Sequence, residues 1–188
     1  METTPASPLA VVVVALWAML PAYVPNNVAV LVGGSRAIDG GRTWNGRRLL
    51  GDGKTWRGTV ASVAAGIALA VLLDAGHETV GATIGVALPS FTPAAAVGLA
   101  GGAMLGDVAA SFLKRRTGRE RGAAFPGVDQ LDFVVGAVAL AAPFDPGWFS
   151  ETFLEPATVL VAVVVLTPGL HLGTNGIAYW LGLKDEPY

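Results

Sequence analysis

Long apolar runs alternate with shorter polar segments along the whole chain, and this pattern predicts an all-α integral membrane protein. A transmembrane helix needs about 20 mainly apolar residues. Five runs approach or exceed that length, at about residues 6–32, 59–73, 93–113, 131–144 and 156–183. The fourth is short, and the fifth is longer than a span requires. We therefore expect five transmembrane helices, forming a single transmembrane domain over residues 1–188.

The composition favours the same class. Hydrophobic residues make up 53% of the chain and charged residues only 14%, with a mean hydropathy of +0.57. A typical soluble domain carries charge on about 25% of its residues. No basic residue precedes the first apolar run, so we expect a retained span rather than a cleavable signal peptide. The absence of cysteine excludes disulfides, thiolate metal sites and cysteine nucleophiles.

The basic residues are confined to alternate polar segments of this arrangement. Residues 33–58, residues 114–127 and the C-terminal tail hold all of them, whereas the N-terminus, residues 76–92 and residues 145–155 hold none. Lys and Arg accumulate in cytoplasmic loops. We therefore expect the N-terminus outside, the C-terminus inside and two basic cytoplasmic loops. The twelve residues are Arg36, Arg42, Arg47, Arg48, Lys54, Arg57, Lys114, Arg115, Arg116, Arg119, Arg121 and Lys184.

One acidic residue, Asp107, lies inside the third apolar run. A charged group near the bilayer centre costs about 2.5–3.5 kcal/mol on insertion scales, so such residues are functional candidates. Ser111 follows at i+4, and Lys114 and Arg115 follow at i+7 and i+8. At 3.6 residues per turn these side chains share one helix face with Asp107. This face predicts a polar path from the membrane towards the basic loop.

Asp129 and Asp132 open the fourth run, and their i, i+3 spacing puts both on one face of a helix. Acidic residues in a first turn also suit the helix dipole, and that purely structural interpretation stays open. Together with Asp107, however, three carboxylates at similar depth would repel one another without a cation. Mg²⁺ prefers one or two carboxylates combined with substrate phosphates. The sequence therefore predicts a Mg²⁺ site at Asp107, Asp129 and Asp132.

Basic residues near these aspartates predict phosphate binding. Lys114 and Arg115 lie on the Asp107 face, and Arg and Lys bind phosphate oxygens well. The segment Gly51-Asp-Gly-Lys-Thr-Trp-Arg-Gly58 interleaves acid, base and glycine, and glycine permits close backbone approach to a ligand. Its spacing is not that of a P-loop. Its candidate ligand contacts are Asp52, Lys54 and Arg57.

Two further groups of residues have structural interpretations that we favour. Glycines and alanines of the second and third runs, such as Gly66 and Gly102, suit close helix packing in lipid. His171 and Asn175 are spaced i, i+4 in the fifth run. The histidine fits a packed, hydrogen-bonded role better than catalysis, whereas Ser111 and Asn175 are kept as candidate nucleotide contacts. The sequence contains no hydrolase or zinc-protease motif.

Two motifs carry a family resemblance. The stretch Gly106-Asp-Val-Ala-Ala-Ser-Phe-Leu-Lys-Arg-Arg116, followed by Phe125-Pro-Gly-Val-Asp-Gln-Leu-Asp132, resembles the C-terminal signature of CDP-diacylglycerol synthases. The bacterial pattern has a His-Gly-Gly stretch and an Arg inside the acidic pair, where this chain has Val128 and Gln130. The loop 51–58, the stretch 126–133 and the ending from His171 to Asp185 resemble the narrower archaeal CDP-archaeol synthase family.

This resemblance implies an enzyme of the cell membrane whose active site faces the cytoplasm. It would be a CTP-dependent cytidylyltransferase that converts a 2,3-bis-O-geranylgeranylglycerol 1-phosphate type lipid to a CDP-archaeol-type lipid and pyrophosphate, in ether phospholipid biosynthesis. Its partners would be CTP, the isoprenoid ether-lipid phosphate and membrane lipids. A homodimer is compatible with the sequence, and no nucleic acid partner is expected. The implied catalytic residues are Asp107, Asp129, Asp132, Lys114 and Arg115.

Two alternatives remain open at this stage. CDP-alcohol phosphotransferases also use intramembrane aspartates, although their Asp-Gly-x-x-Ala-Arg signature is missing here. A small cation carrier could line its pathway with Asp107, Asp129 and Asp132. Carriers often show inverted repeats, and none is visible in this sequence.

Overall fold

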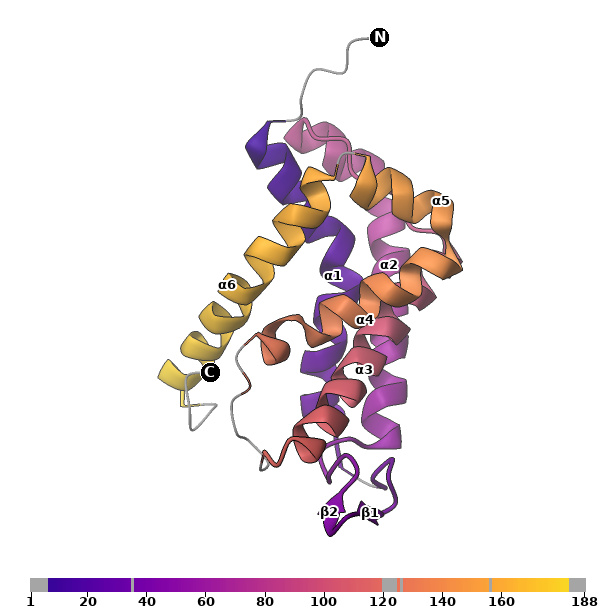
Figure 1. Ribbon diagram of the computed structural model, residues 1–188. Coiled ribbons are helices and arrows are strands. Elements are labelled where there is room, and N and C mark those ends of the chain that lie inside the picture. The colour runs from indigo at the N-terminus through magenta and orange to yellow at the C-terminus, as the bar shows by residue number, and fades with distance from the viewer. Residues whose placement is uncertain (1–6, 35, 120–124, 126, 156, 183–188) are drawn as a thin grey trace.

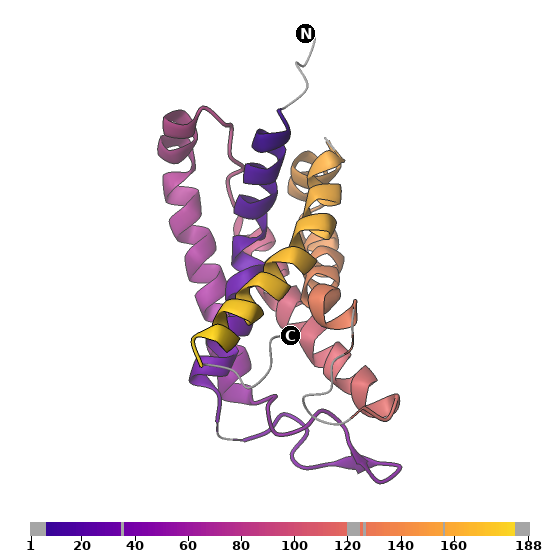
Figure 2. The same cartoon turned by 90° about the vertical axis from the view of Figure 1, so that its left-hand side faces the viewer.

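The structure is a computed structural model that describes residues 7–34, 36–119, 125, 127–155 and 157–182. Its elements are helices apart from one small hairpin (Figures 1 and 2). The hairpin pairs Thr43 with Arg48 and Trp44 with Arg47. The elements, in chain order, are α1 (Pro8–Val32), β1 (Thr43–Trp44), β2 (Arg47–Arg48), α2 (Trp56–Ile84), α3 (Pro93–Arg116), α4 (Val128–Phe144), α5 (Pro146–Phe149), the π-helical turn η1 (Ser150–Leu154) and α6 (Thr158–Trp180).

The predicted class, an all-helical membrane protein, is confirmed. Within the described residues α1, α2 and α3 are each long and apolar enough to cross a membrane. The pair formed by Pro146–Leu154 and Thr158–Thr174, bent by 76°, gives a fourth span when taken as one broken helix. Helix α4 has 17 residues, fewer than the roughly 20 of a full span. The five predicted runs thus correspond to the five long helices α1, α2, α3, α4 and α6. Three of these qualify as spans by themselves, and α6 contributes to a fourth when it is taken together with Pro146–Leu154.

The second helix is longer than predicted. We expected it over residues 59–73 with a loop at 76–92, but α2 continues to Ile84 and ends at Gly85, whose positive φ of 69° gives a left-handed cap. The polar residues of this last part make local contacts that suit a helix. Thr83 Oγ1 donates to the carbonyl oxygen of Thr79 (2.8 Å), and His77 Nδ1 lies 2.6 Å from that of Asp74. Polar composition alone therefore did not mark the helix end.

Helices α3 and α4 approach each other at backbone distance. A Cβ atom at Gly102 would overlap the carbonyl oxygen of Gly136, and one at Gly106 would overlap the carbonyl oxygen of Asp132. At Gly98 it would lie 2.7 Å from the Cα atom of Ala141. Small residues permit such close contact in lipid, as expected from the sequence. The contact sets the register that brings Asp107 and Asp132 to neighbouring turns.

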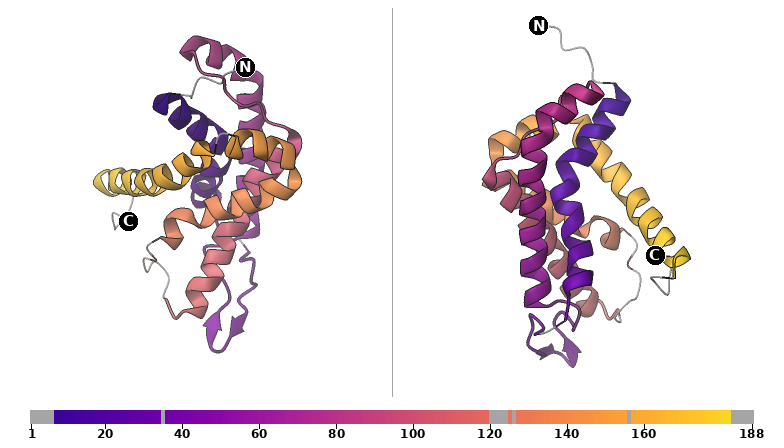
Figure 3. Two further views of the ribbon diagram at one scale, coloured as in Figure 1. Left: turned by 45° about the horizontal axis from the view of Figure 1, so that its top comes forward. Right: turned by 180° about the vertical axis from the view of Figure 1, so that it is seen from behind.

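The described residues of the two basic segments lie at one end of the bundle. The hairpin and the C-terminal end of α3 are together there, while the start of α1 and the α2–α3 connection lie at the other end (Figures 1 and 3). Arg116 joins the two segments, since its Nη1 donates to the carbonyl oxygen of Trp44 (2.8 Å) and its Nη2 to that of Arg48 (2.9 Å). Arg121 and Lys184 fall outside the described residues.

Candidate active site

Two lysine–aspartate ion pairs occupy the basic end of α3 and α4. Lys54 Nζ lies 2.7 Å from Oδ1 and 2.5 Å from Oδ2 of Asp107. Lys114 Nζ lies 2.5 Å from Oδ1 of Asp129. All four side chains are largely buried, with exposed fractions between 19% and 26%. Buried charges are tolerated when they are paired, so each lysine compensates an aspartate that would otherwise be costly at this depth.

Asp132 differs from the other two aspartates. It is half-buried, and its Oδ1 accepts a hydrogen bond from the backbone N–H of Phe133 at 2.6 Å. The ion pairs found among the described residues do not include it. Helix α4, which carries Asp132, contacts helix α3, which carries Asp107, at Gly106. Asp132 is therefore the aspartate best placed to accept an additional cation.

The predicted three-carboxylate cluster is looser than expected. Over the described ranges, no group of three or more His, Asp or Glu side chains is close enough to hold one metal ion. Lys54 and Lys114 instead supply positive charge to two of the carboxylates. Mg²⁺ needs only one or two protein carboxylates when substrate phosphates complete its coordination. The oxygen donors present therefore fit Mg²⁺ bound together with a nucleotide.

Consecutive basic residues of α3 point to different partners. Lys114 contacts Asp129, whereas Arg115 donates from Nε to the carbonyl oxygen of Leu50 (3.4 Å) and from Nη1 to that of Arg119 (3.2 Å). The sequence interpretation placed Lys114 and Arg115 on one face with Asp107. The structure separates their roles, because Lys114 joins the carboxylates and Arg115 joins the loop before α2.

Arg115 borders a cationic cavity of about 400 Å³. Four arginines and one aspartate account for the charged groups of its wall. Guanidinium groups bind phosphate oxygens in bidentate geometry, so a cavity with this excess of arginine suits a polyphosphate. The lining residues are Arg47, Arg48, Gly51, Asp52, Arg115, Gly118 and Arg119.

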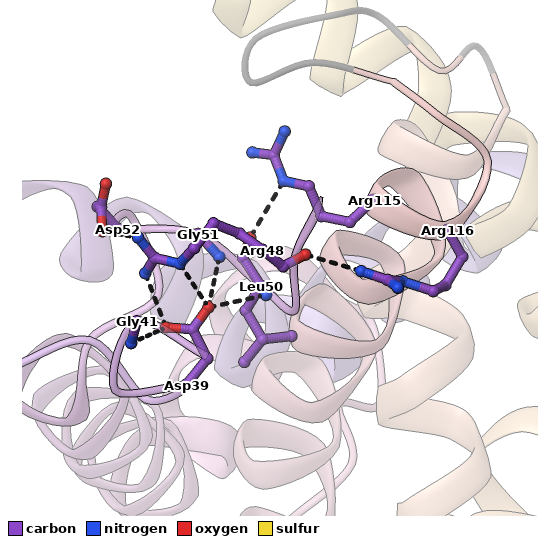
Figure 4. A network of polar contacts seen from close by, with 8 residues as sticks. All are labelled: Asp39, Gly41, Arg48, Leu50, Gly51, Asp52, Arg115 and Arg116. Atoms are coloured by element: carbon purple, nitrogen blue, oxygen red, sulfur yellow. Dashed lines mark hydrogen bonds and ion pairs between the residues drawn. The ribbon is translucent and has the colours of Figure 1, made fainter. Parts of the chain in front are cut away.

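Asp39 organises one wall of this cavity and was missed by the sequence analysis (Figure 4). Its side chain is only 1% exposed although it belongs to a loop. Arg48 donates to both carboxylate oxygens, from Nη2 to Oδ1 (2.8 Å) and from Nε to Oδ2 (3.2 Å). The backbone N–H groups of Gly41, Leu50 and Gly51 donate at 3.0, 3.0 and 3.1 Å. Five donors thus converge on one buried carboxylate.

The electrostatics of this pair follow from the hydrogen bonds. Those from Arg48 and from the three backbone N–H groups hold the pKa of Asp39 well below its usual range, although desolvation by burial opposes them. Hydrogen bonds to Asp39 and Asp52 raise the pKa of Arg48 above its usual value. The only sequence signal for Asp39 was its place before Gly40-Gly41, a turn pattern in which aspartate accepts backbone N–H groups.

The other predicted site residues are placed as follows. Asp52 is 70% exposed and accepts a hydrogen bond from Arg48 Nη1 at 2.7 Å. Arg57 is exposed on the first turn of α2, and Ser111 is half-buried on α3 one turn after Asp107. Asn175 belongs to α6, but its side chain lies outside the described part of the chain. The structure thus groups Asp52 with the cavity rather than with the aspartates.

An apolar groove of about 660 Å³ runs between α3 and α4 and reaches Asp132. Its wall is apolar except at this polar end, where Gly127 and Asp132 contribute. Gly127 donates its backbone N–H to Oε1 of Gln130 at 2.5 Å, which caps the start of α4. The apolar wall of the groove suits contact with hydrocarbon chains. Its lining residues include Leu105, Ala109, Leu113, Leu131, Val135 and Leu140.

The sequence of this chain is similar to those of known proteins. A family model described as "CarS-like: CDP-archaeol synthase" matches residues 9–188. CDP-archaeol synthase of Halobacterium salinarum is 67% identical over 177 residues, which cover 94% of this chain and 97% of the relative. That of Haloarcula marismortui is 68% identical with the same coverage. That of Methanospirillum hungatei is 49% identical over 174 residues, covering 90% of this chain and all of the relative.

A solved structure is also similar. It is described as an intramembrane enzyme for archaeal membrane lipids biosynthesis, and it aligns with a TM-score of 0.62 at 37% sequence identity. The alignment covers 86% of this chain and 92% of that chain. The likeness therefore extends over most of the chain.

Proposed function

The chain belongs to the CDP-archaeol synthase family, and we therefore propose that it transfers the CMP group of CTP to an isoprenoid ether-lipid phosphate, releasing pyrophosphate. It is a membrane enzyme of archaeal lipid biosynthesis, as the family membership and the intramembrane neighbour indicate. The acceptor that the family implies is a 2,3-bis-O-geranylgeranylglycerol 1-phosphate type lipid, and the product is a CDP-archaeol-type lipid.

One observation supports this reaction above the alternatives. The cationic cavity and the apolar groove share helix α3, with Arg115 lining the first and Leu105 and Leu113 lining the second. Of the aspartates, Asp107 belongs to the same helix and Asp132 to the polar end of the groove. Such an arrangement suits a reaction that joins a polyphosphate to a lipid headgroup.

The chemistry is an in-line displacement at phosphorus. An oxygen of the lipid phosphate forms a bond to the α-phosphorus of CTP while the bond from that phosphorus to the β-phosphate oxygen breaks, and pyrophosphate leaves. A lipid phosphate is anionic at neutral pH, so no general base is required. Phosphoryl-group transfer depends mainly on positioning and on charge neutralisation, and these are the tasks left to the protein.

The residues of the site divide these tasks. The arginines of the cavity would hold the phosphates of CTP, and Lys54 and Lys114 would contribute positive charge where negative charge accumulates. Asp132, with Asp107 or Asp129 as a second carboxylate, would hold Mg²⁺ together with the phosphates. The chemistry that Mg²⁺ supplies when bound is neutralisation of phosphate charge and polarisation of the phosphorus centre. The groove would receive a hydrocarbon chain of the lipid.

We further propose the finer membrane topology from the charge distribution. Five spans with the N-terminus outside would place both basic segments, and with them the cavity, on the cytoplasmic side of the cell membrane. CTP would enter from the cytoplasm and the lipid phosphate from the inner leaflet. The hairpin and the C-terminal end of α3 lie at the same end of the bundle (Figure 1), which supports this assignment.

The test is pyrophosphate release by the purified protein in detergent with CTP, Mg²⁺ and geranylgeranyl-ether glycerol phosphate. We expect release that depends on both substrates, formation of the CDP lipid, and loss of both in Asp132→Asn with membrane insertion intact. Absence of release with this lipid and with diacyl phosphatidic acid would contradict the proposed function. Activity like the wild type in Asp132→Asn would remove that residue from the metal site.

A further inference from the structure

We propose that Asp39 is a positioning residue for nucleotide binding, which shapes the cationic cavity and sets the place of Lys54 without touching the substrate. The inference rests on the proposed function. It concerns a residue that lies twelve positions before Gly51 and outside both motifs of the family resemblance. Asp39 is buried within a segment whose other charged side chains are more exposed.

The loop from Ala37 to Thr55 has little apolar material to hold its shape. Its regular structure is the two-residue hairpin and an isolated bridge between Ala37 and Thr55. The carboxylate of Asp39 holds the loop in shape instead, because it binds backbone N–H groups at three separate positions of the loop. A buried carboxylate whose acceptors are all satisfied specifies one conformation, and an amide in its place leaves donors unpaired.

Two backbone hydrogen bonds link the Asp39 segment to Lys54. The N–H of Ile38 donates to the carbonyl oxygen of Lys54 (2.8 Å), and the N–H of Lys54 donates to that of Gly51 (3.3 Å). The N–H of Gly51 in turn donates to Asp39. The backbone of Lys54 is thus held from both sides by groups that depend on Asp39, and its Nζ reaches Asp107 from there.

Asp39 also determines how the cavity wall presents its charge. It binds the Nε and Nη2 edge of Arg48 and leaves Nη1 for Asp52. It holds Gly51, which lies against Arg115, so that a Cβ there would be 3.2 Å from Nη2. Leu50, fixed by the same carboxylate, accepts the hydrogen bond from Arg115 Nε. Movement of the loop would therefore displace two of the cavity's arginines together.

A matched carboxylate exists at the opposite end of the bundle. Asp145 caps α5, accepting from Trp148 N–H (3.1 Å) and from Thr92 Oγ1 (2.5 Å). It resembles Asp39 in accepting hydrogen bonds from a backbone N–H and from a side-chain donor, and it lies outside the proposed site. Asp145→Asn is therefore a control for the general effect of neutralising a loop carboxylate.

The experiment measures steady-state pyrophosphate release in Asp39→Asn, Arg48→Lys, the double variant and Asp145→Asn, together with apparent melting temperatures and CTP binding by calorimetry. We expect Asp39→Asn to raise KM for CTP about tenfold or more, because small misplacements of binding groups have effects of this size. KM for the lipid phosphate should stay unchanged. The double variant should be no worse than Asp39→Asn, since both residues act as one unit.

Each outcome decides the question. A KM and a calorimetric Kd for CTP within about twofold of wild type in Asp39→Asn would overturn the inference, even with a lowered melting temperature. If Asp39→Asn fails to fold, Asp39→Glu, which keeps the charge but displaces the carboxylate, decides by the same criterion. An equal rise of KM for CTP in Asp145→Asn would also overturn it. A wild-type protein that neither binds nor turns over CTP would overturn the proposed function itself.

Discussion

Lys54 and Asp107 are separated by 53 positions in the chain, yet the ammonium group of one contacts both carboxylate oxygens of the other. The contact joins the loop before α2 to the middle of the α3 surface. The ammonium group compensates the charge of Asp107. A phosphate that enters would compete with Asp107 for the lysine, and Mg²⁺ would compete with the lysine for the aspartate. On the proposed function, the pair would therefore couple nucleotide binding to the position of the loop.

Removing the charge of Lys54 should impair turnover more than folding. In Lys54→Gln we expect kcat/KM for CTP to fall about 100-fold, the usual effect of removing one group that stabilises developing charge. The measurement is the initial rate of pyrophosphate release over a range of CTP concentrations. Arg42→Gln is the control, because Arg42 is exposed in the same loop and outside the cavity wall. Equal rates for Lys54→Gln and wild type would contradict the assignment.

The helix contact at Gly106 should tolerate no added methyl group. In Gly106→Ala the Cβ atom would overlap the Asp132 carbonyl oxygen, so the helices must separate. Such overpacking costs typically about 1–3 kcal/mol, and it would move Asp132. We expect a lower apparent melting temperature and loss of activity. In Gly101→Ala the added atom would meet Leu140 Cδ2 at 3.6 Å, an ordinary contact, and both properties should be retained.

The stabilisation from Asp39 should persist in mild acid. Its pKa is lowered in the folded protein, so its contribution is fully present above the unfolded pKa of about 3.9 and is lost only as pH falls towards the folded value. The melting-temperature difference between wild type and Asp39→Asn should therefore be constant from pH 8 down to about pH 5. It should shrink at lower pH. A difference that vanishes near pH 6 would show that the carboxylate is not held in this way.

Divalent cations should be required for both binding and turnover. EDTA should abolish pyrophosphate release, and excess Mg²⁺ should restore it. Mg²⁺ and CTP together should raise the apparent melting temperature more than either alone, because ligands that bind the folded state stabilise it. Asp132→Asn should lose the part of this rise that depends on Mg²⁺. EDTA-resistant turnover would contradict the Mg²⁺ proposal.

The positions of the helices were largely predictable from hydrophobic runs, because lipid demands long apolar segments whose ends carry charge. The runs at 6–32, 93–113 and 131–144 agree closely with α1, α3 and α4. The C-terminal end of α2 was not predictable in this way. Gly76, His77 and Glu78 resemble a loop in composition, and only their local helical hydrogen bonding shows that the helix continues.

The candidate residues could be named from the sequence, but their ion-pair partners could not. Helical spacing placed Asp107 and Lys114 on one face of a helix. The ion-pair partner of each residue comes from another element, and periodicity within one helix carries no information about that. The sequence analysis missed Asp39 for a related reason. Its importance depends on burial and on five converging donors, and neither is visible for one acidic residue in an arginine-rich loop.

The backbone contact between α3 and α4 has an evolutionary consequence. Gly102, Gly106 and Gly136 hold the aspartate-bearing turns together through main-chain atoms, independently of the side chains that line the groove. Substitutions at outward positions such as Leu105 or Val135 can therefore reshape the lipid-facing wall while the reacting centre stays in place. Proteins that evolve from this fold can therefore change which hydrocarbon chain they accept while they keep the residues that join the lipid to a nucleotide.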